Sequence, residues 1–391
     1  MKIVQVFADW KWTGPSEPIL LQTRALMDRG NEVILSAAYP PKDAGEKESI
    51  VSYARGMGIK VNGSVSWDRK TKAGNLFGVP TIIRDTRALM RLIDDIPADI
   101  VSAHSSHDHF VAKRAIRGSL AGPLLVRTDH KRDFIPGGVG NRFLLNRGTD
   151  GVVTFSRAGA SSLLRDFDIP RDKIIVVDPA LDLDRWDPAI PAVDMRSELK
   201  VPRDTFVIGM VARFQKYRKT DVVISAFASV LKKFPNARLL LIGRSSQMEE
   251  SVIKPARKLG IEDKIITPGY LTKYYRDALK IIDLFVFMMP GSDGTARALR
   301  EVMALGIPVA AARVGMIPEI VKDGVSGLLM EPNRVAVETV MLKLLGDEEL
   351  RKRLGRGARE RALSRFDVRA QAEKIEKFFR ELILKKGFGG A

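Results

Sequence analysis

Residues 284–309 read LFVFMMPGSDGTARALREVMALGIPV, an apolar run followed by a glycine-rich turn and a helical pattern. This order predicts a buried strand at 284–288 and a helix at 295–305. The N–H groups at a helix N-terminus can bind a phosphate when small residues let it approach. Asp293 precedes the helix and Glu301 lies eight residues later, on nearly the same helical face. We expect both carboxylates to accept hydrogen bonds from ligand hydroxyls; a helix cap and a surface residue are the alternative.

A second candidate segment follows the strand expected at 206–211. It contains four basic residues, Arg213, Lys216, Arg218 and Lys219. Ligands of α/β sheets bind at the carboxyl ends of the strands, and arginine can hold two phosphate oxygens at once. This loop therefore predicts a phosphate site, with an exposed basic turn as the alternative.

Short β-branched runs alternate with longer amphipathic stretches along the rest of the chain, which predicts βαβ units with parallel sheets. The pattern restarts after a stretch rich in proline and aspartate at 178–202. We therefore expect an α/β protein with two Rossmann-like, doubly wound domains that face a central cleft. The expected divisions are an N-terminal domain at 1–185, a linker at 186–203, a C-terminal domain at 204–365, and a helix at 366–391 that packs across the domains.

The expected elements follow from the same periodicity. Strands are expected at 2–8, 32–37, 100–103, 123–128, 151–155, 173–177, 206–211, 237–242, 264–267, 284–288 and 309–311. Helices are expected at 17–29, 81–96, 109–117, 158–167, 221–234, 248–259, 274–281, 295–305, 335–345 and 368–385.

Composition excludes several classes of protein. The 391 residues include no cysteine, which rules out thiol catalysis, cysteine-ligated iron–sulfur clusters and cysteine-ligated zinc. Neither half has a G-x-G-x-x-G after its first strand, and no G-x-x-x-x-G-K-[ST] occurs, so a nicotinamide dehydrogenase and a P-loop NTPase are disfavoured.

No run approaches the roughly 20 apolar residues that span a bilayer. We expect a cytoplasmic protein, with the inner face of the membrane as a peripheral location.

The net charge of +17 suggests an anionic partner. Residues 191–391 carry 37 basic and 24 acidic side chains, a net of +13, and residues 111–165 carry ten and three, a net of +7. The basic residues are not interleaved with aromatic ones as in a nucleic-acid groove, so we expect no nucleic-acid partner. The +7 segment is instead a candidate for contact with an anionic membrane.

All four histidines lie between positions 104 and 130. Three of them, His104, His107 and His109, surround Asp108 and could be a metal cluster. The other two interpretations are a binding role on the acceptor side of the cleft, through His104 or His107, and hydrogen-bonded structural roles. We expect no metal site.

Together these segments resemble the retaining GT-B glycosyltransferases, and more closely family 4 of the nucleotide-sugar transferases. The resemblance rests on Arg213 with a basic residue five positions on, and on the Asp293–Glu301 motif that leads into MALGIPV at 303–309. Further similar blocks lie at 99–104, 128–130, 182–186, 315–321 and 324–329.

The resemblance implies roles for individual residues. Those implied to be catalytic are His130, which would reach the donor sugar, Asp293, which would contact its hydroxyls, and Arg213 and Lys219, which would bind the diphosphate. Arg218 lies at the family's usual lysine position, so either it or Lys219 would serve. The other donor-binding residues implied are Gly14, Gly243, Tyr270, Gly294, Thr295, Ala296, Arg297 and Glu301. No divalent metal and no cofactor are expected, because the basic pair and the helix dipole would stabilise the diphosphate.

The function implied is hexosyl or heptosyl transfer from a nucleotide-diphosphate sugar to a hydroxyl of a glycan or glycolipid acceptor. The implied setting is the synthesis of lipopolysaccharide, cell-surface polysaccharide or glycolipid.

The chain departs from the family pattern at three places. Asp293 replaces a glutamate, Gly14-Pro15 replaces a Gly-Gly loop, and Pro179-Ala180-Leu181 replaces Pro-Asn-Gly. These departures favour, as alternatives, an unusual donor or a catalytically lapsed protein that still binds nucleotide or a partner. A sugar-nucleotide epimerase would need a different C-terminal pattern, and a nucleic-acid role rests on charge alone.

Overall fold

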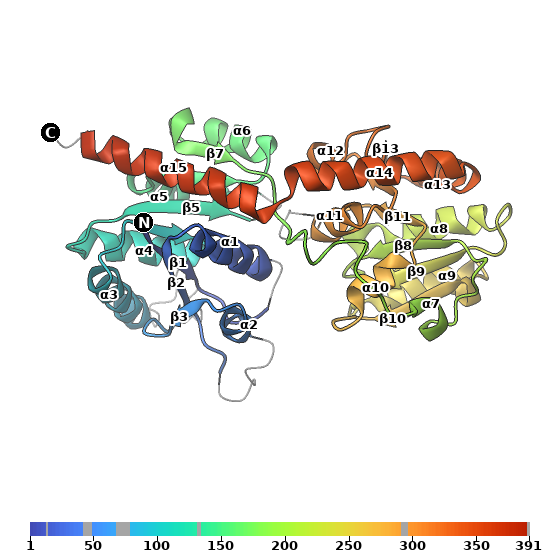
Figure 1. Cartoon of the computed structure of the whole chain (residues 1–391), viewed down its shortest axis with the longest axis horizontal. Helices are drawn as coiled ribbons and strands as arrows, with labels where there is room; N and C mark the ends of the chain where they lie inside the picture. Colours follow the sequence, from blue (N-terminus) through green and yellow to red (C-terminus); the bar gives the residue numbers. More distant parts are fainter. Residues whose placement is uncertain (13–14, 42–48, 68–78, 131–133, 291–295, 389–391) are drawn as a thin grey trace. The chain divides into compact units, whose positions relative to one another are not determined.

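The chain folds into two α/β units, each built on one parallel sheet (Figure 1). Unit 1 comprises residues 1–180 and 368–391, and unit 2 comprises residues 181–367. This computed structural model describes the whole chain except residues 13–14, 42–48, 68–78, 131–133, 291–295 and 389–391. The chain passes between the units twice, so the C-terminal helix belongs to unit 1.

Unit 1 contains a seven-stranded sheet in the order β3-β2-β1-β4-β5-β6-β7. Every neighbouring pair is parallel, because a helix or a long connection returns the chain between strands. Its elements are β1 (Lys2–Phe7), α1 (Ser16–Asp28), β2 (Glu32–Ala37), α2 (Ile50–Gly56), β3 (Lys60–Asn62), α3 (Val79–Asp95), β4 (Ile100–Ala103), α4 (Ser106–Gly118), β5 (Leu124–Asp129), α5 (Val139–Gly148), β6 (Gly151–Thr154), α6 (Arg157–Asp166), β7 (Ile174–Val176) and α15 (Val368–Phe388).

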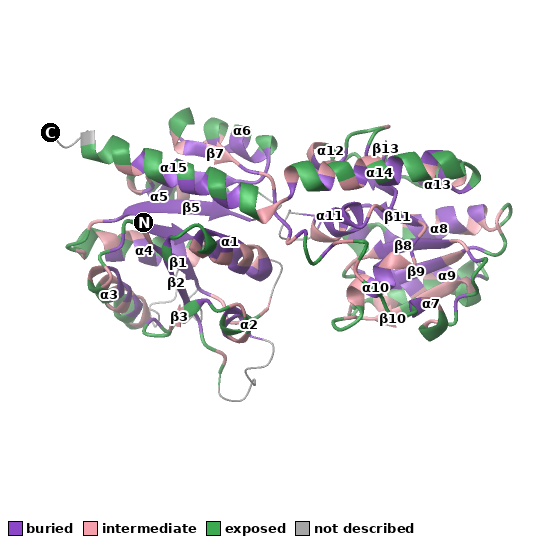
Figure 2. Ribbon diagram, viewed as in Figure 1, coloured by how far each residue is buried: buried purple, intermediate pink, exposed green. Residues whose placement is uncertain are grey.

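Helices cover both faces of this sheet, and its central strands are buried (Figure 2). On one face, Phe7 of β1 packs with residues of α1 and α2, and α15 covers Gly151 of β6 so closely that a Cβ there would lie 2.6 Å from Leu382. On the other face, Val101 of β4 packs with residues of α3 and α4. The strands therefore read as continuous apolar runs rather than as alternating ones.

Unit 2 contains a six-stranded parallel sheet in the order β10-β9-β8-β11-β12-β13. Its elements are α7 (Met195–Glu198), β8 (Val207–Val211), α8 (Thr220–Val230), β9 (Arg238–Ile242), α9 (Lys254–Lys258), β10 (Ile265–Gly269), α10 (Tyr275–Lys280), β11 (Leu284–Phe287), α11 (Arg297–Ala304), β12 (Val309–Ala312), α12 (Ile317–Ile320), β13 (Leu328–Met330), α13 (Arg334–Gly346) and α14 (Glu348–Arg365).

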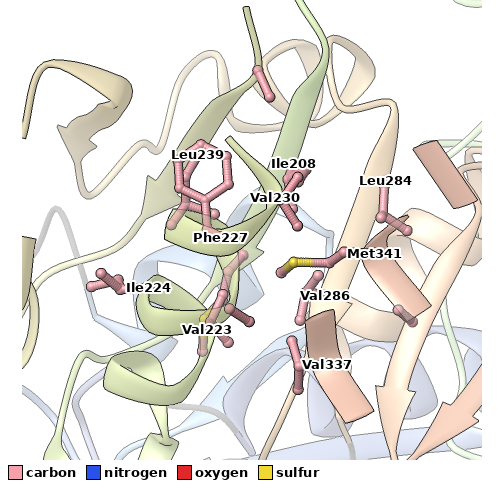
Figure 3. Packing of buried hydrophobic residues seen from close by; sticks show 14 of the residues in the cluster. Ile208, Val223, Ile224, Phe227, Val230, Leu239, Leu284, Val286, Val337 and Met341 are labelled. Carbon is pink, nitrogen blue, oxygen red and sulfur yellow. The ribbon is translucent and has the colours of Figure 1, made fainter. Parts of the chain in front are cut away.

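The core of unit 2 lies between its sheet and the helices α8 and α13 (Figure 3). Phe227 and Val230 of α8 and Met341 of α13 are fully buried against strand residues such as Leu239 and Val286. Burying side chains of this size stabilises the fold by about 1.5–3 kcal/mol each. This packing fixes the strands whose carboxyl ends carry the candidate site.

Each sheet has a point at which the strand order reverses. In unit 1, β1 lies between β2 and β4, and in unit 2, β8 lies between β9 and β11. The loops on the two sides of such a point turn away from each other, which leaves room for a ligand at the carboxyl edge. The loop after β8 is the basic segment expected to bind phosphate, and the segment after β11 leads into α11.

The elements differ from the expected ones mainly by omission. Seven of the strands and α-helices described here were not expected: β3, α2, α5, α7, α12, β13 and α14. The helix expected at 248–259 is divided into a π-turn at Glu249–Ile253 and the short helix α9. Residues 186–203, expected as a linker, lie within unit 2, where the Trp186 side chain is buried. No helix among the described residues is both long enough and apolar enough to cross a membrane.

Candidate functional site

The basic loop of unit 2 begins where β8 ends. Arg213 and Lys219 are exposed, whereas Arg218 between them is buried. Lys219 adopts the left-handed conformation (φ +60°) at the start of α8, which is uncommon for a residue with a side chain. This turn directs two neighbouring basic residues differently, one to solvent and one into unit 2.

Arg218 connects this loop to the segment after β11. Its Nη1 donates a hydrogen bond of 2.5 Å to the carbonyl oxygen of Met289, two residues after the end of β11. The guanidinium also lies 5.2 Å from the centre of the Tyr217 ring. Arg218 therefore holds the backbone just before residues 291–295 in place, whereas Lys219 presents its charge to solvent at the carboxyl edge of the sheet.

Glu301 is the most buried charged residue of the candidate site, with 1% of its surface exposed. Its Oε1 accepts a hydrogen bond of 2.6 Å from Arg297 Nε, and its Oε2 accepts one of 2.8 Å from the Tyr275 hydroxyl. Arg297 and Glu301 are four residues apart on α11, so they share one face. Each carboxylate oxygen can accept a second hydrogen bond, so Glu301 can still receive a ligand hydroxyl.

Gly243 directly follows β9, the neighbour of β8, and Tyr270 directly follows β10, the next strand outward in the sheet. Gly243 has φ +145°, and a Cβ there would lie 1.9 Å from the carbonyl oxygen of Ala212. Its N–H donates to the carbonyl oxygen of Gly269 at 2.9 Å. The guanidinium of Arg244 lies 4.7 Å from the ring centre of the exposed Tyr270. The loops after β8, β9 and β10 thus start side by side, and only glycine can occupy position 243 without moving them.

In unit 1, two histidines that are distant in sequence form a pair. Nδ1 of His104 lies 2.9 Å from Nε2 of His130, and Nε2 of His104 lies 2.6 Å from Oε1 of Gln5. All three side chains are buried. Burial lowers the pKa of His104 well below its usual range, and the charges of His130 and Arg127 lower it further. Burial, followed by the charge of Arg127, lowers the pKa of His130 to about 3, so both rings are neutral at pH 7.

A buried arginine lies near these histidines. Arg127 of β5 is 1% exposed, and its guanidinium has no hydrogen-bond partner among the described residues. Its nearest carboxylates, of Asp108 and Asp129, lie 3.8 Å away. Burial raises the pKa of Asp108, although Arg127 and the Ser105 hydrogen bonds oppose that effect. Burial is thus the main reason that the neighbouring imidazoles are neutral, and the charge of Arg127 adds to it.

The remaining two histidines do not join the pair. His109 lies on α4, where its Nε2 donates to Thr149 Oγ1 at 2.9 Å, and that hydroxyl donates to the carbonyl oxygen of Leu144. Burial lowers the pKa of His109 to about 3, so it has the hydrogen-bonded structural role that the sequence left open. His107 is half-buried at the start of α4. Within the described ranges, no three His, Asp or Glu side chains are grouped so that they could hold a metal ion.

Two family models match the chain, one for each half. The model described as Glycosyltransferase Family 4 matches residues 19–185, and Glycosyl transferases group 1 matches residues 193–361. This chain belongs to the family 4 glycosyltransferases. Its two parallel-sheet units form the GT-B fold, as expected.

Individual relatives agree with this assignment. The chain is 32% identical over 238 residues to the D-inositol 3-phosphate glycosyltransferase of Segniliparus rotundus, a match that covers 58% of this chain and 51% of that protein. The chain thus spans about half the length of the curated relatives that it matches. A glycosyltransferase from Rickettsia africae has the same fold, with a TM-score of 0.81, 18% identity and 98% of each chain covered. Anabaena HepE in complex with UDP and glucose has a TM-score of 0.78 at 18% identity, over 97% of this chain and 100% of that one.

The structure locates most, but not all, of the residues that the family resemblance implied. Gly14, Asp293, Gly294 and Thr295 lie outside the described residues. Ala296 is buried and has φ +49°, directly before α11. Unit 2 carries Arg213, Lys219, Gly243, Tyr270 and Glu301 at one edge of its sheet. The histidines expected on the donor and acceptor sides, His130 and His104, form one hydrogen-bonded pair.

Three further residues near the candidate site were not singled out from the sequence. Tyr275 binds Glu301, Gln5 binds His104, and the charge of Arg127 acts on both His104 and His130. A charged residue within the apolar strand at 123–128 was a visible signal for Arg127. Neither Tyr275 nor Gln5 had one, because their partners are 26 and 99 positions away in the chain.

Proposed function

We propose that this chain transfers a sugar from a nucleotide-diphosphate sugar to a hydroxyl group of an acceptor, with retention of anomeric configuration. The observation that carries the proposal is the contact of Arg218 with the carbonyl oxygen of Met289. It ties the basic loop to the segment that leads into α11, at the point where the strand order of unit 2 reverses. Ligands of doubly wound sheets bind at such points.

The proposed chemistry exchanges one bond at the anomeric carbon for another. The bond from that carbon to the donor phosphate breaks, and a bond to the acceptor oxygen forms on the same face. The acceptor proton passes to the departing phosphate, which leaves as the nucleoside diphosphate. The exposed charges of Arg213 and Lys219 stabilise the negative charge that develops on the diphosphate. We propose that they do so without a divalent metal.

The donor that we propose is a UDP-hexose. The Anabaena protein, which has the same fold, is in complex with UDP and glucose, and this supports the proposal of a uridine nucleotide donor. Gly243 leaves space for the base beside Tyr270, and Glu301 accepts hydrogen bonds from the ribose hydroxyls. A heptose donor would use the same diphosphate contacts, so the experiment compares donors that differ in the sugar.

The acceptor that we propose is a hydroxyl compound with an anionic group. The Segniliparus relative is named for D-inositol 3-phosphate, which has both features. Phosphorylated saccharides of lipopolysaccharide, cell-surface polysaccharide or glycolipids have them too, so these acceptors are compared in the same assay.

The test measures UDP release from UDP-glucose in the presence of each acceptor, with GDP- and ADP-sugars for comparison. Arg213→Ala and Lys219→Ala are each expected to lower turnover by about 100-fold, because each removes a charge that stabilises the transition state. Glu301→Gln is expected mainly to raise KM, because it weakens ribose binding. NMR of the product gives the anomeric configuration.

The matched control is Arg203→Ala. Arg203 is exposed and lies before β8, at the opposite edge of the same sheet, so its loss should leave turnover unchanged. Equal effects of the Arg203 and Arg213 variants would contradict the site. Nucleotide binding without transfer for every donor and acceptor would contradict the activity and favour the lapsed protein.

We also propose that one surface of unit 1 contacts an anionic membrane. Phe110, Lys113, Arg114 and Arg117 are spaced i, i+3, i+4 and i+7 on α4, so they share one face. The Lys113 ammonium lies 4.0 Å from the ring centre of Phe143 on α5. Phe110 and Phe143 are 36% and 58% exposed. Exposed aromatic rings among basic side chains are typical of peripheral membrane surfaces. We call these five residues the α4–α5 patch.

Sedimentation with vesicles tests the α4–α5 patch. Vesicles of phosphatidylglycerol should bind the protein, and vesicles of phosphatidylcholine should not. Replacing Arg114 and Arg117 with Glu should weaken binding at least about tenfold, since each basic residue contributes about 1 kcal/mol near an anionic surface. The exposed pair Lys232 and Lys233 of unit 2, replaced in the same way, is the control. Equal binding by both variants would show that net charge, rather than this patch, binds the vesicles.

A further inference from the structure

A chain of hydrogen bonds crosses the carboxyl edge of the seven-stranded sheet. It runs from Gln5 on β1 through His104, directly after β4, to His130, directly after β5. These three strands are neighbours, and the strand order reverses between β1 and β4. The three exposed fractions are 0%, 4% and 2%. The chain therefore lies where an α/β sheet binds ligands, and its three side chains are buried.

The direction of these hydrogen bonds follows from the donors available. The Oε1 of Gln5 can only accept, so Nε2 of His104 must carry its hydrogen. A neutral imidazole has one donor and one acceptor nitrogen, so Nδ1 of His104 accepts, and Nε2 of His130 donates to it. That leaves Nδ1 of His130 as an acceptor. Both rings stay neutral at pH 7, so no second proton alters this order.

Nδ1 of His130 is buried and has no hydrogen-bond partner among the described residues. Leaving a buried acceptor without a partner costs about 1–3 kcal/mol. The ring cannot easily turn to find one, because His104 holds its other nitrogen and the Phe155 ring packs 5.0 Å from its centre. The lone pair is thus held in one direction and needs a donor from outside the described part of the chain.

We propose that Gln5 and His104 are positioning residues that hold His130 as the Nε2–H tautomer, so that Nδ1 accepts a hydrogen bond from a hydroxyl of the bound donor sugar. This inference rests on the proposed sugar transfer, and it adds to it the contact between His130 and the sugar that the family resemblance implies. Gln5 sets the direction of the whole chain. If it presented its amide NH₂ group instead, every bond would reverse, and Nδ1 of His130 would become a donor.

NMR of the full chain, labelled with ¹⁵N in histidine, reads the tautomers directly. The chain has four histidines, and each signal is assigned by replacing one of them with Asn. In the wild type, His104 and His130 should both carry their hydrogen on Nε2. Addition of UDP-glucose should shift the Nδ1 signal of His130. His109 is the internal reference, because Thr149 holds its tautomer independently of Gln5.

Two variants of Gln5 separate positioning from packing. Gln5→Met keeps the length of the side chain and removes the acceptor, so His130 should become a mixture of tautomers and kcat should fall about tenfold, the effect of one hydrogen bond. Gln5→Glu restores an acceptor, so it should restore the tautomer and most of kcat. The signals of His109 should change little in either variant, and the melting temperature should change little in Gln5→Met.

Several results would overturn the inference. One is a wild-type His130 with its hydrogen on Nδ1, and another is an unchanged tautomer in Gln5→Met. If the tautomers are as expected but UDP-glucose shifts no histidine signal and no sugar is transferred, the proposed function fails and the sugar contact fails with it. If sugar is transferred while Gln5→Met keeps full kcat, only the positioning role fails.

Discussion

At the scale of single residues, Gly243 gives a sharp prediction about stability. Gly243→Ala would place a Cβ 1.9 Å from the carbonyl oxygen of Ala212, at φ +145°. Neither the backbone at position 243 nor the carbonyl group of Ala212 can move without shifting β9 or β8, so we expect the free energy of unfolding to fall by at least about 2 kcal/mol. Gly260 is the control, because it has φ +65° and nothing lies within 4 Å of its Cβ position; Gly260→Ala should cost only about 1 kcal/mol. Urea denaturation measures both, and equal losses would contradict the close contact.

The candidate site was predictable from sequence only where local chemistry determines it. A basic loop after an apolar strand indicated Arg213 and Lys219, and the helical spacing indicated Glu301. The sequence could not decide between Arg218 and Lys219, because the left-handed turn at Lys219 determines which one is buried. The pairing of His104 with His130 was out of reach for a different reason. It depends on the register of β4 against β5, which no local pattern encodes.

At the scale of elements, the pattern of apolar residues predicted the buried strands well and missed the short or polar elements. The strands β2 and β4 have the expected bounds, because each is a mostly apolar run that a parallel sheet buries. β3 and β13 have three residues each, too few for a periodicity. α5 contains Gly140 and has little helix propensity, and it forms because Leu144 and Leu145 are buried.

Proline explains why the expected helix at 248–259 is divided. Pro255 has no backbone N–H, so the hydrogen bond to the residue four positions earlier cannot form. The chain forms a π-turn at Glu249–Ile253, and α9 then begins with Pro255 in its first turn. Pro255 is tolerated there because the first N–H groups of a helix have no partner within it.

At the scale of the whole molecule, the two units should differ in their response to acid. All four histidines lie in unit 1 and none in unit 2. Burial holds the pKa of His109 and of His130 at about 3, and that of His104 well below its usual range. The unfolded chain binds a proton on each histidine below about pH 6.5. The stability of unit 1 is therefore complete above that pH and is lost as pH falls from there toward 3, by up to roughly 1.4 kcal/mol per pH unit for each histidine.

A comparison of pH 7 with pH 5 isolates this effect, because the unperturbed pKa values of Asp and Glu are about 3.9 and 4.3. Asp108 acts in the opposite direction, since its raised pKa lets the folded state take up a proton before the unfolded chain does as the pH falls.

Tryptophan fluorescence and calorimetry together distinguish the two units. Trp10, Trp12 and Trp67 belong to unit 1 and Trp186 to unit 2, so fluorescence mainly reports the unfolding of unit 1, while calorimetry reports that of both. We expect the unfolding temperature of unit 1 to fall by at least about 5 °C from pH 7 to pH 5, with a smaller shift for unit 2. An equal shift in both units would mean that the buried histidines gain protons without unfolding, and hence that their rings reach water.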